Sequence, residues 1–173
     1  MNPTEFRRHL HAHPELSFKE HATAAFIADR LTELGIEHRP IARTGVLARI
    51  EGHGKADPKR RAIVLRADID ALPITEQNDI GWRSCNPGVM HACGHDAHMA
   101  MMLALCDYLE ENHKKYKFNV LVIFQPAEES IGGAKVICES GALDKHHVSK
   151  VFGLHVWPKL EKNAIGSRPG PMM

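Results

Sequence analysis

The sequence lacks the features that mark several specialised classes of protein. Its formal net charge is only +1 over 173 residues, and its basic runs are short, so we expect no nucleic-acid partner. No apolar run reaches the ~20 residues that a membrane-spanning helix needs, and residues 1–16 are polar where a secretory signal would be apolar. We therefore expect neither a membrane partner nor export. Hydrophobic (43%) and charged (25%) contents are those of an ordinary globular domain.

Cysteine is scarce and forms no CxxC pair. The four residues are Cys85, Cys93, Cys106 and Cys138. In the absence of a secretory segment we expect a reduced, cytoplasmic setting, in which thiols are available as ligands rather than tied in disulfides. The GxSxG, P-loop and GxGxxG motifs are also absent, which removes the usual signatures of a serine-hydrolase elbow and of phosphate-binding loops. Histidine, with 13 residues, is the one type in excess.

The spacing of apolar residues predicts helices that alternate with strands. The predicted helices span residues 4–13, 20–34, 97–109 and 133–139. The predicted strands span residues 46–50, 62–65, 119–124 and 151–156, with a turn over 52–58. Thr4 is a plausible N-cap of the first helix, and Gly35 stands where the second helix would end. This alternation predicts an α/β fold, a three-layer αβα sandwich with a mostly parallel sheet.

Polar residues with metal-binding or acid–base chemistry come directly after the predicted buried strands. In open α/β sheets, functional sites collect at the carboxyl ends of the strands. The residues at these positions are Asp68 and Asp70 after the second strand, Glu128 and Glu129 after the third, and His155 in the last. The sequence therefore predicts that these side chains meet at one edge of the sheet.

The segment MHACGHDAHMAMM (90–102) is the strongest local signal for metal binding. Zinc and similar ions accept thiolate, imidazole and carboxylate ligands. Cys93 and His95 can face one point if their segment is extended or turned, and Gly94 between them permits an unusual backbone conformation. Asp96 suits the positive end of the following helix dipole whether or not it contacts a metal. His91 and His98 are candidates for supporting or substrate-side positions.

The remaining polar residues have alternative interpretations. Glu128 and Glu129 are either two acids of a solvated loop, or a metal ligand and a general base that activates water. His155 alone would most often be a hydrogen-bonded core histidine. Asp68 and Asp70 share a strand face, and could orient a ligand imidazole or approach the metal. A further alternative makes Cys93 a nucleophile paired with a histidine, but it leaves the carboxylates without a role.

Five ordered segments together resemble the M20 metallopeptidase family. They are LHAHPELSFKE (10–20), LRADIDALPI (65–74), MHACGHDAHMAMM (90–102), FQPAEES (124–130) and GLHVWP (153–158). The closer resemblance is to the aminoacylase branch, which includes hippurate hydrolases, N-acyl amino acid amidohydrolases and N-acetyldiaminopimelate deacetylases. It implies hydrolysis of the amide bond of a small N-acyl amino acid by an enzyme with two divalent metal ions, usually Zn²⁺ or Mn²⁺, with Co²⁺ or Ni²⁺ as further options.

The resemblance also implies a division of roles among the candidate residues. By motif position Cys93, His95, Glu129 and His155 resemble metal ligands. Glu128 resembles the general base, and Asp70 resembles the acidic residue that holds the site in register.

Family members are about twice as long as this chain. We therefore expect residues 1–173 to be the N-terminal portion of the metal-binding catalytic domain, without the satellite (dimerisation) domain and the C-terminal part that carries a last histidine ligand. The expected fold is then C-terminally incomplete. Two functions remain open: a metal-dependent amidohydrolase, or a non-catalytic remnant that binds metal or forms homo-oligomers through its sheet edge.

Overall fold

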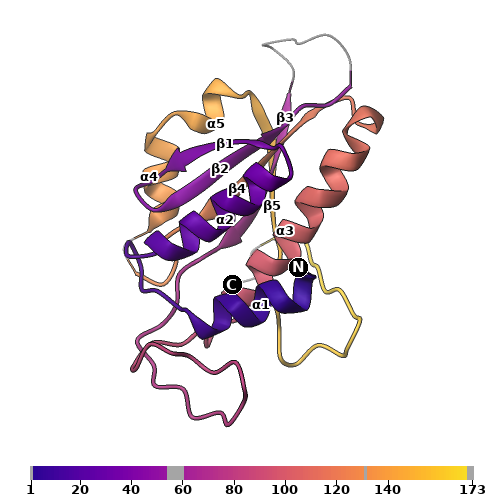
Figure 1. Ribbon diagram of the computed structural model, residues 1–173. Coiled ribbons are helices and arrows are strands. Elements are labelled where there is room, and N and C mark those ends of the chain that lie inside the picture. The colour runs from indigo at the N-terminus through magenta and orange to yellow at the C-terminus, as the bar shows by residue number, and fades with distance from the viewer. Residues whose placement is uncertain (1, 54–60, 131, 171–173) are drawn as a thin grey trace.

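A computed structural model describes residues 2–53, 61–130 and 132–170 (Figure 1). The strands are β1 (Glu37–Ile41), β2 (Gly45–Ile50), β3 (Ala62–Asp68), β4 (Asn119–Gln125) and β5 (Val148–Gly153). The helices are α1 (Pro3–Ala12), α2 (His21–Glu33), α3 (His95–Asn112), α4 (Gly133–Glu139) and α5 (Ala142–Lys145), with a short 3-10 turn at His113–Lys115. Of the predicted turn over 52–58, residues 54–58 lie outside the described residues. None of the helices in the described ranges has the length and hydropathy needed to cross a membrane.

The strands form one sheet in the order β1-β2-β4-β3-β5. β3 runs parallel to β4 on one side and to β5 on the other, whereas β2 pairs antiparallel with both β1 and β4. The predicted α/β class is confirmed, and its parallel part consists of β4, β3 and β5. β1 was not predicted, because the sequence EHRPI has little apolar character and contains Pro40. A proline is tolerated there because β1 is an edge strand.

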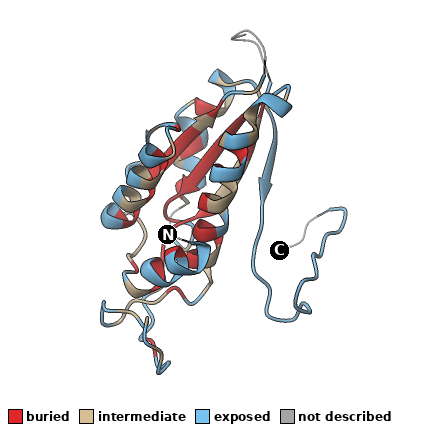
Figure 2. Cartoon of the chain, turned by 45° about the vertical axis from the view of Figure 1, so that its right-hand side comes forward, coloured by how far each residue is buried: buried red, intermediate tan, exposed pale blue. Residues whose placement is uncertain are grey.

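β4 is the centre of the core and is buried at all seven positions. Because side chains alternate across a strand, Val120, Val122 and Phe124 pack on the side of α2 and α3. Leu121 and Ile123 pack against α4 and α5 on the opposite side. Figure 2 shows the buried residues concentrated in the central strands and on the helix faces turned toward them. Helices on both faces of the sheet give the predicted three-layer arrangement.

The helices begin and end close to the predicted residues. In α1 the N-cap is Asn2 rather than Thr4, because Pro3 takes the first helical position and the Asn2 side chain accepts a hydrogen bond from the Glu5 N–H at 3.0 Å. Glu5 accepts a return bond from the Asn2 N–H at 2.7 Å, which completes a capping box. Gly35, with φ of +72°, follows the end of α2 as predicted.

The last strand differs from the prediction in position and in burial. β5 ends at Gly153, so His155 lies beyond the strand rather than within it. Val151 and Phe152 are 56% and 51% exposed. The apolar run indicated a buried strand, but β5 has a neighbour on one side only. Figure 2 shows the following segment leaving the sheet as an exposed strap.

Candidate metal centre

The candidate ligands gather where β3 and β4 end and α3 begins. The parallel register pairs Asp68 with Gln125, and the Ile69 N–H donates to the Gln125 carbonyl at 3.0 Å. The polar residues that follow the two strands therefore share one edge of the sheet, as the sequence predicted.

The loop before α3 turns sharply at Gly94. This residue has φ of +86° and is the N-cap of α3, so the backbone there is left-handed, as few residues other than glycine allow. A Cβ at this position would lie 2.6 Å from Val156 Cγ2. The turn leaves Cys93 half-buried in the loop and places His95 in the buried first turn of α3.

The His95 imidazole is held from one side and left open on the other. Its Nδ1 lies 2.9 Å from the Asp70 carbonyl oxygen and 3.4 Å from Asp70 Oδ1, so it donates its proton there. Its Nε2 is buried, has no hydrogen-bond partner among the described residues and lies 3.8 Å from Glu129 Oε1. Burial alone would lower the pKa of His95, but Asp70 and Asp68 outweigh it and raise that pKa. An imidazole fixed through one nitrogen, with the other aimed at carboxylates, has the arrangement of a metal ligand.

Asp70 connects three parts of the site. One carboxylate oxygen accepts from Ser17 Oγ at 2.7 Å and from the Glu129 N–H at 2.9 Å. Burial alone would raise the pKa of Asp70, but hydrogen bonds from His95, Glu129 and Ser17 keep it below its ordinary value. Asp70 is therefore an anion that orients both a histidine and the turn after β4. Ser17 was not predicted as part of the site, although it lies in the quoted segment 10–20.

The two glutamates lie on a turn that follows β4. Glu128 is exposed, whereas Glu129 is half-buried and its Oε1 has no hydrogen-bond partner in the described residues. Ligand atoms of His95, Glu128 and Glu129 all lie within 4.8 Å of one another. The acids therefore converge on His95 rather than pointing apart into solvent.

Cys93 and His155 complete a second group around His95. Cys93 Sγ lies 3.3 Å from His155 Nε2, and ligand atoms of Cys93, His95 and His155 all lie within 4.8 Å. Burial, together with Glu129, raises the pKa of Cys93 to about 12. A thiol with that pKa is protonated at neutral pH, so this arrangement does not activate Cys93 as a free nucleophile.

A third group contains Asp68, His95 and His98, whose ligand atoms also lie within 4.8 Å. His98 Nε2 accepts the Val156 N–H at 3.0 Å, and Arg66 forms an ion pair with Asp68. Burial, opposed by Arg66, raises the pKa of Asp68 to about 6. His98, one of the two less clear histidines in the sequence, thus lies beside the cluster.

Two other residues of the His-rich segment lie outside the three groups. Asp96, in the first turn of α3, is buried and pairs with Arg7 at 3.0 Å and with His11 at 2.9 Å. His11 also lies 3.0 Å from the buried Glu76. Asp96 therefore has two structural partners of its own, Arg7 and His11. His91 is buried with no hydrogen-bond partner among the described residues.

The donor set fits a divalent metal ion. Two buried atoms of the cluster that could bind a cation, His95 Nε2 and Glu129 Oε1, lack a hydrogen-bond partner in the described ranges. Leaving a buried polar atom unpaired costs about 1–3 kcal/mol, and a cation among them removes that cost. Imidazole, carboxylate and thiolate are the ligand types of Zn²⁺, while imidazole and carboxylate also suit Mn²⁺.

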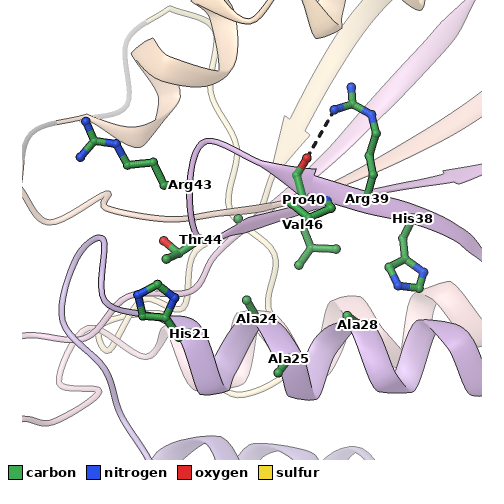
Figure 3. A pocket seen from close by; sticks show the side chains of 11 residues that line it. His21, Ala24, Ala25, Ala28, His38, Arg39, Pro40, Arg43, Thr44 and Val46 are labelled. Atoms are coloured by element: carbon green, nitrogen blue, oxygen red, sulfur yellow. Dashed lines mark hydrogen bonds between the residues drawn. The ribbon is translucent and has the colours of Figure 1, made fainter.

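A separate cavity of about 350 Å³ lies between α2 and the β1–β2 hairpin and contains none of these candidate ligands. Figure 3 shows Val46 facing Ala24 and Ala28 of α2 across it, with Thr44 and His21 at one end. The candidate metal centre is therefore distinct from this pocket.

The fold and this cluster define a layered α/β domain with a candidate metal centre at the carboxyl ends of its parallel strands. Residues 64–170 match the model of peptidase family M20/M25/M40. The chain belongs to this family.

Curated relatives are similar over nearly the whole chain. It is 46% identical over 168 residues to the N-acetyl-L-cysteine deacetylase of Bacillus subtilis, a match that covers 96% of this chain and 39% of that protein. It is 44% identical over 170 residues to an N-acyl-L-amino acid amidohydrolase of Geobacillus stearothermophilus, with coverage of 97% and 44%. The chain thus spans about two fifths of the length of these relatives.

A solved structure shows the same fold. A Bacillus subtilis protein described as a dinuclear metal-binding peptidase of the M20 family superposes with a TM-score of 0.91 at 43% identity. The match covers 98% of this chain and 46% of that one.

Proposed function

We propose that this chain is the N-terminal, metal-binding portion of the catalytic domain of an amidohydrolase that cleaves the amide bond of small N-acyl amino acids. The observation that carries the proposal is the convergence of thiol, imidazole and carboxylate groups on the buried His95. The names of the two curated relatives support the substrate class. The match covers 39% and 44% of those relatives, and we assign the satellite domain and the remaining catalytic residues to the part of them that lies outside the match.

We assign the metal-binding role to Cys93, His95, Glu129 and His155. The relative described as dinuclear supports two ions, and the donor types favour Zn²⁺ or Mn²⁺, with Co²⁺ or Ni²⁺ as substitutes. A divalent ion held by these residues would supply Lewis acidity toward the amide carbonyl and the attacking water.

Glu128 is the proposed general base. Its carboxylate is exposed, so it can meet a substrate, and it lies within 4.8 Å of the ligand atoms of His95 and Glu129. It takes a proton from the attacking water, whose oxygen bonds to the acyl carbon. As the C–N bond breaks, the electron pair leaves with the nitrogen, and Glu128 donates the proton to it. Asp70 holds His95 and the Glu129 backbone in place during this step.

The first experiment is a calorimetric titration of Zn²⁺ and Mn²⁺ into chelator-stripped protein. We expect tight binding of one or two ions that Cys93→Ala weakens and Cys85→Ala does not, since Cys85 is exposed and outside the three groups. Glu128→Gln should retain metal and abolish hydrolysis of N-acetyl and N-benzoyl amino acids, assayed where the unsubstituted protein is active. Binding that is indifferent to Cys93, or turnover that survives Glu128→Gln, would contradict the assignment.

A second candidate function is a non-catalytic remnant that binds metal or associates with other copies. It is favoured by the exposed apolar side chains in and after β5, which include Phe152, Leu154 at 69%, Trp157 and Ile165 at 89% exposure. Light scattering separates the two functions, because a stable monomer counts against the remnant.

We also propose a cytoplasmic location for the amidohydrolase. The four unpaired cysteines support it.

A further inference from the structure

Glu20 is a fully buried carboxylate to which the proposed mechanism gives no role. It stands at the start of α2 and is 0% exposed. Its Oε2 accepts from Thr44 Oγ1 at 2.5 Å and its Oε1 accepts from the Ala127 N–H at 2.9 Å. No lysine or arginine pairs with it in the part of the chain that the structure describes. Burying an acid without a cation is costly, and its two hydrogen bonds, which offset part of that cost, tie Glu20 to another feature of the fold.

That feature is the turn that carries the two glutamates. Ala127 is 0% exposed, and its backbone has φ of +52°. This is a left-handed conformation that residues other than glycine rarely adopt. Such a residue keeps this conformation only when its surroundings hold it there. Glu20 holds its N–H, while its carbonyl accepts from the Gly133 N–H at 3.0 Å. The next two residues along the chain are Glu128 and Glu129.

Two buried carboxylates thus hold this turn from either side. Glu20 accepts the Ala127 N–H, and Asp70 accepts the Glu129 N–H at 2.9 Å. Asp70 also contacts His95, whereas Glu20 is tied through Thr44 to the start of β2. Thr44 also lies at one end of the cavity in Figure 3, whose lining contains none of the candidate metal ligands. The position of the glutamates therefore depends on contacts from α2 and β2 as well as from the site itself.

We propose that Glu20 is a positioning residue, which fixes the Glu128–Glu129 turn through the Ala127 N–H so that both carboxylates face the metal centre. The inference rests on the proposed function for its consequence in metal binding. Its structural part, the control of the turn by Glu20, can be measured without metal.

The test compares Glu20→Ala with Glu20→Gln. Glutamine keeps an oxygen that can accept the Ala127 N–H, and alanine does not. In Glu20→Ala we expect the Ala127 and Glu129 amides to exchange with solvent at least 10-fold faster, and Zn²⁺ affinity to fall about 10-fold or more. In Glu20→Gln both quantities should stay within about 3-fold of wild type. The Co²⁺-loaded protein adds a spectroscopic readout, because its visible bands should change in Glu20→Ala only.

Leu31→Ala is the control for general destabilisation. Leu31 lies in the same helix, is 0% exposed and contacts the core rather than the turn. It should lower stability while leaving Zn²⁺ affinity and the Glu129 amide within about 3-fold of wild type, measured where each variant is folded. If Glu20→Ala does not fold, Thr44→Val replaces it and should shift both readouts in the same direction.

Unchanged exchange at Glu129 in Glu20→Ala, or equal effects of Leu31→Ala, would overturn the role of Glu20. If the wild-type chain binds no metal but Glu20→Ala still releases the turn, the proposed function fails while the control of the turn by Glu20 stands. The two failures are therefore distinguishable.

Discussion

The contact between Gly133 and the turn before it predicts a large effect from adding a single methyl group. Gly133 begins α4 and is buried. A Cβ at this position would lie 1.8 Å from the Pro126 carbonyl oxygen and 2.8 Å from the Pro126 carbonyl carbon. Both atoms belong to the backbone, so no side-chain rotation can relieve the overlap. The turn or the start of α4 must move.

Gly133→Ala should therefore destabilise the protein although alanine is the better helix former. Helix propensity alone would favour alanine by up to about 1 kcal/mol. Overpacking against a fixed backbone costs about 1–3 kcal/mol, and the hydrogen bond from the Gly133 N–H to the Ala127 carbonyl, 3.0 Å long, is worth roughly 0.5–1.5 kcal/mol. A net loss of about 1–4 kcal/mol lowers Tm by about 2–4 °C per kcal/mol in a chain of this size.

The assay is thermal and urea unfolding of Gly133→Ala beside Gly81→Ala. Gly81 has no positive φ, and a Cβ there would meet nothing within 4 Å. It should be neutral within about 0.5 kcal/mol. A Gly133→Ala protein as stable as wild type would refute the backbone overlap as the reason for glycine at this position.

Three further predictions concern the core, the buried ion pairs and the site. Leu103→Ala, at a residue 1% exposed, should cost about 2–5 kcal/mol in urea unfolding, and a loss below 1 kcal/mol would contradict its place in the core. Hydrogen bonds and charges from Asp96 and Glu76 raise the pKa of His11 against the opposing effect of burial. The stability that the folded protein gains from protonated His11 is therefore full below about pH 6.5 and is lost as pH rises through the raised pKa. The free energy of unfolding, measured from pH 5.5 to 8.5, should decline in wild type and change less in His11→Ala. Equal slopes in the two proteins would contradict the contribution of His11. Asp70→Asn should weaken Zn²⁺ binding about 10–100-fold in calorimetry, and unchanged affinity would show that His95 needs no anionic partner.

Much of the fold follows from local pattern. The helical spacing that predicted residues 4–13, 20–34 and 133–139 is matched by α1, α2 and α4, and the apolar run 119–124 is matched by β4. These elements are predictable because the period of the apolar residues is itself the surface that each element buries. The edge strands were harder to predict. β1 has little apolar pattern, and the apolar run 151–156 indicated more burial than β5 has.

The candidate site was also predictable from the sequence only in part. The order of motifs and strands predicted that Asp70, Glu128 and Glu129 would reach the edge where His95 lies, because parallel strands bring their carboxyl ends together. That these residues bind metal remains a prediction. Ser17 carries no local signal for its contact with Asp70, which comes from 53 positions away.

The sequence by itself determined which segments become helices and central strands, and which polar residues stand at their ends. Only the tertiary structure decided that Glu20 holds the N–H of Ala127, 107 positions along the chain, and that Ala127 takes a left-handed conformation. Periodicity reports the face that a segment buries. It carries no information about which distant hydrogen-bonding group will meet it, because that depends on how the finished layers pack.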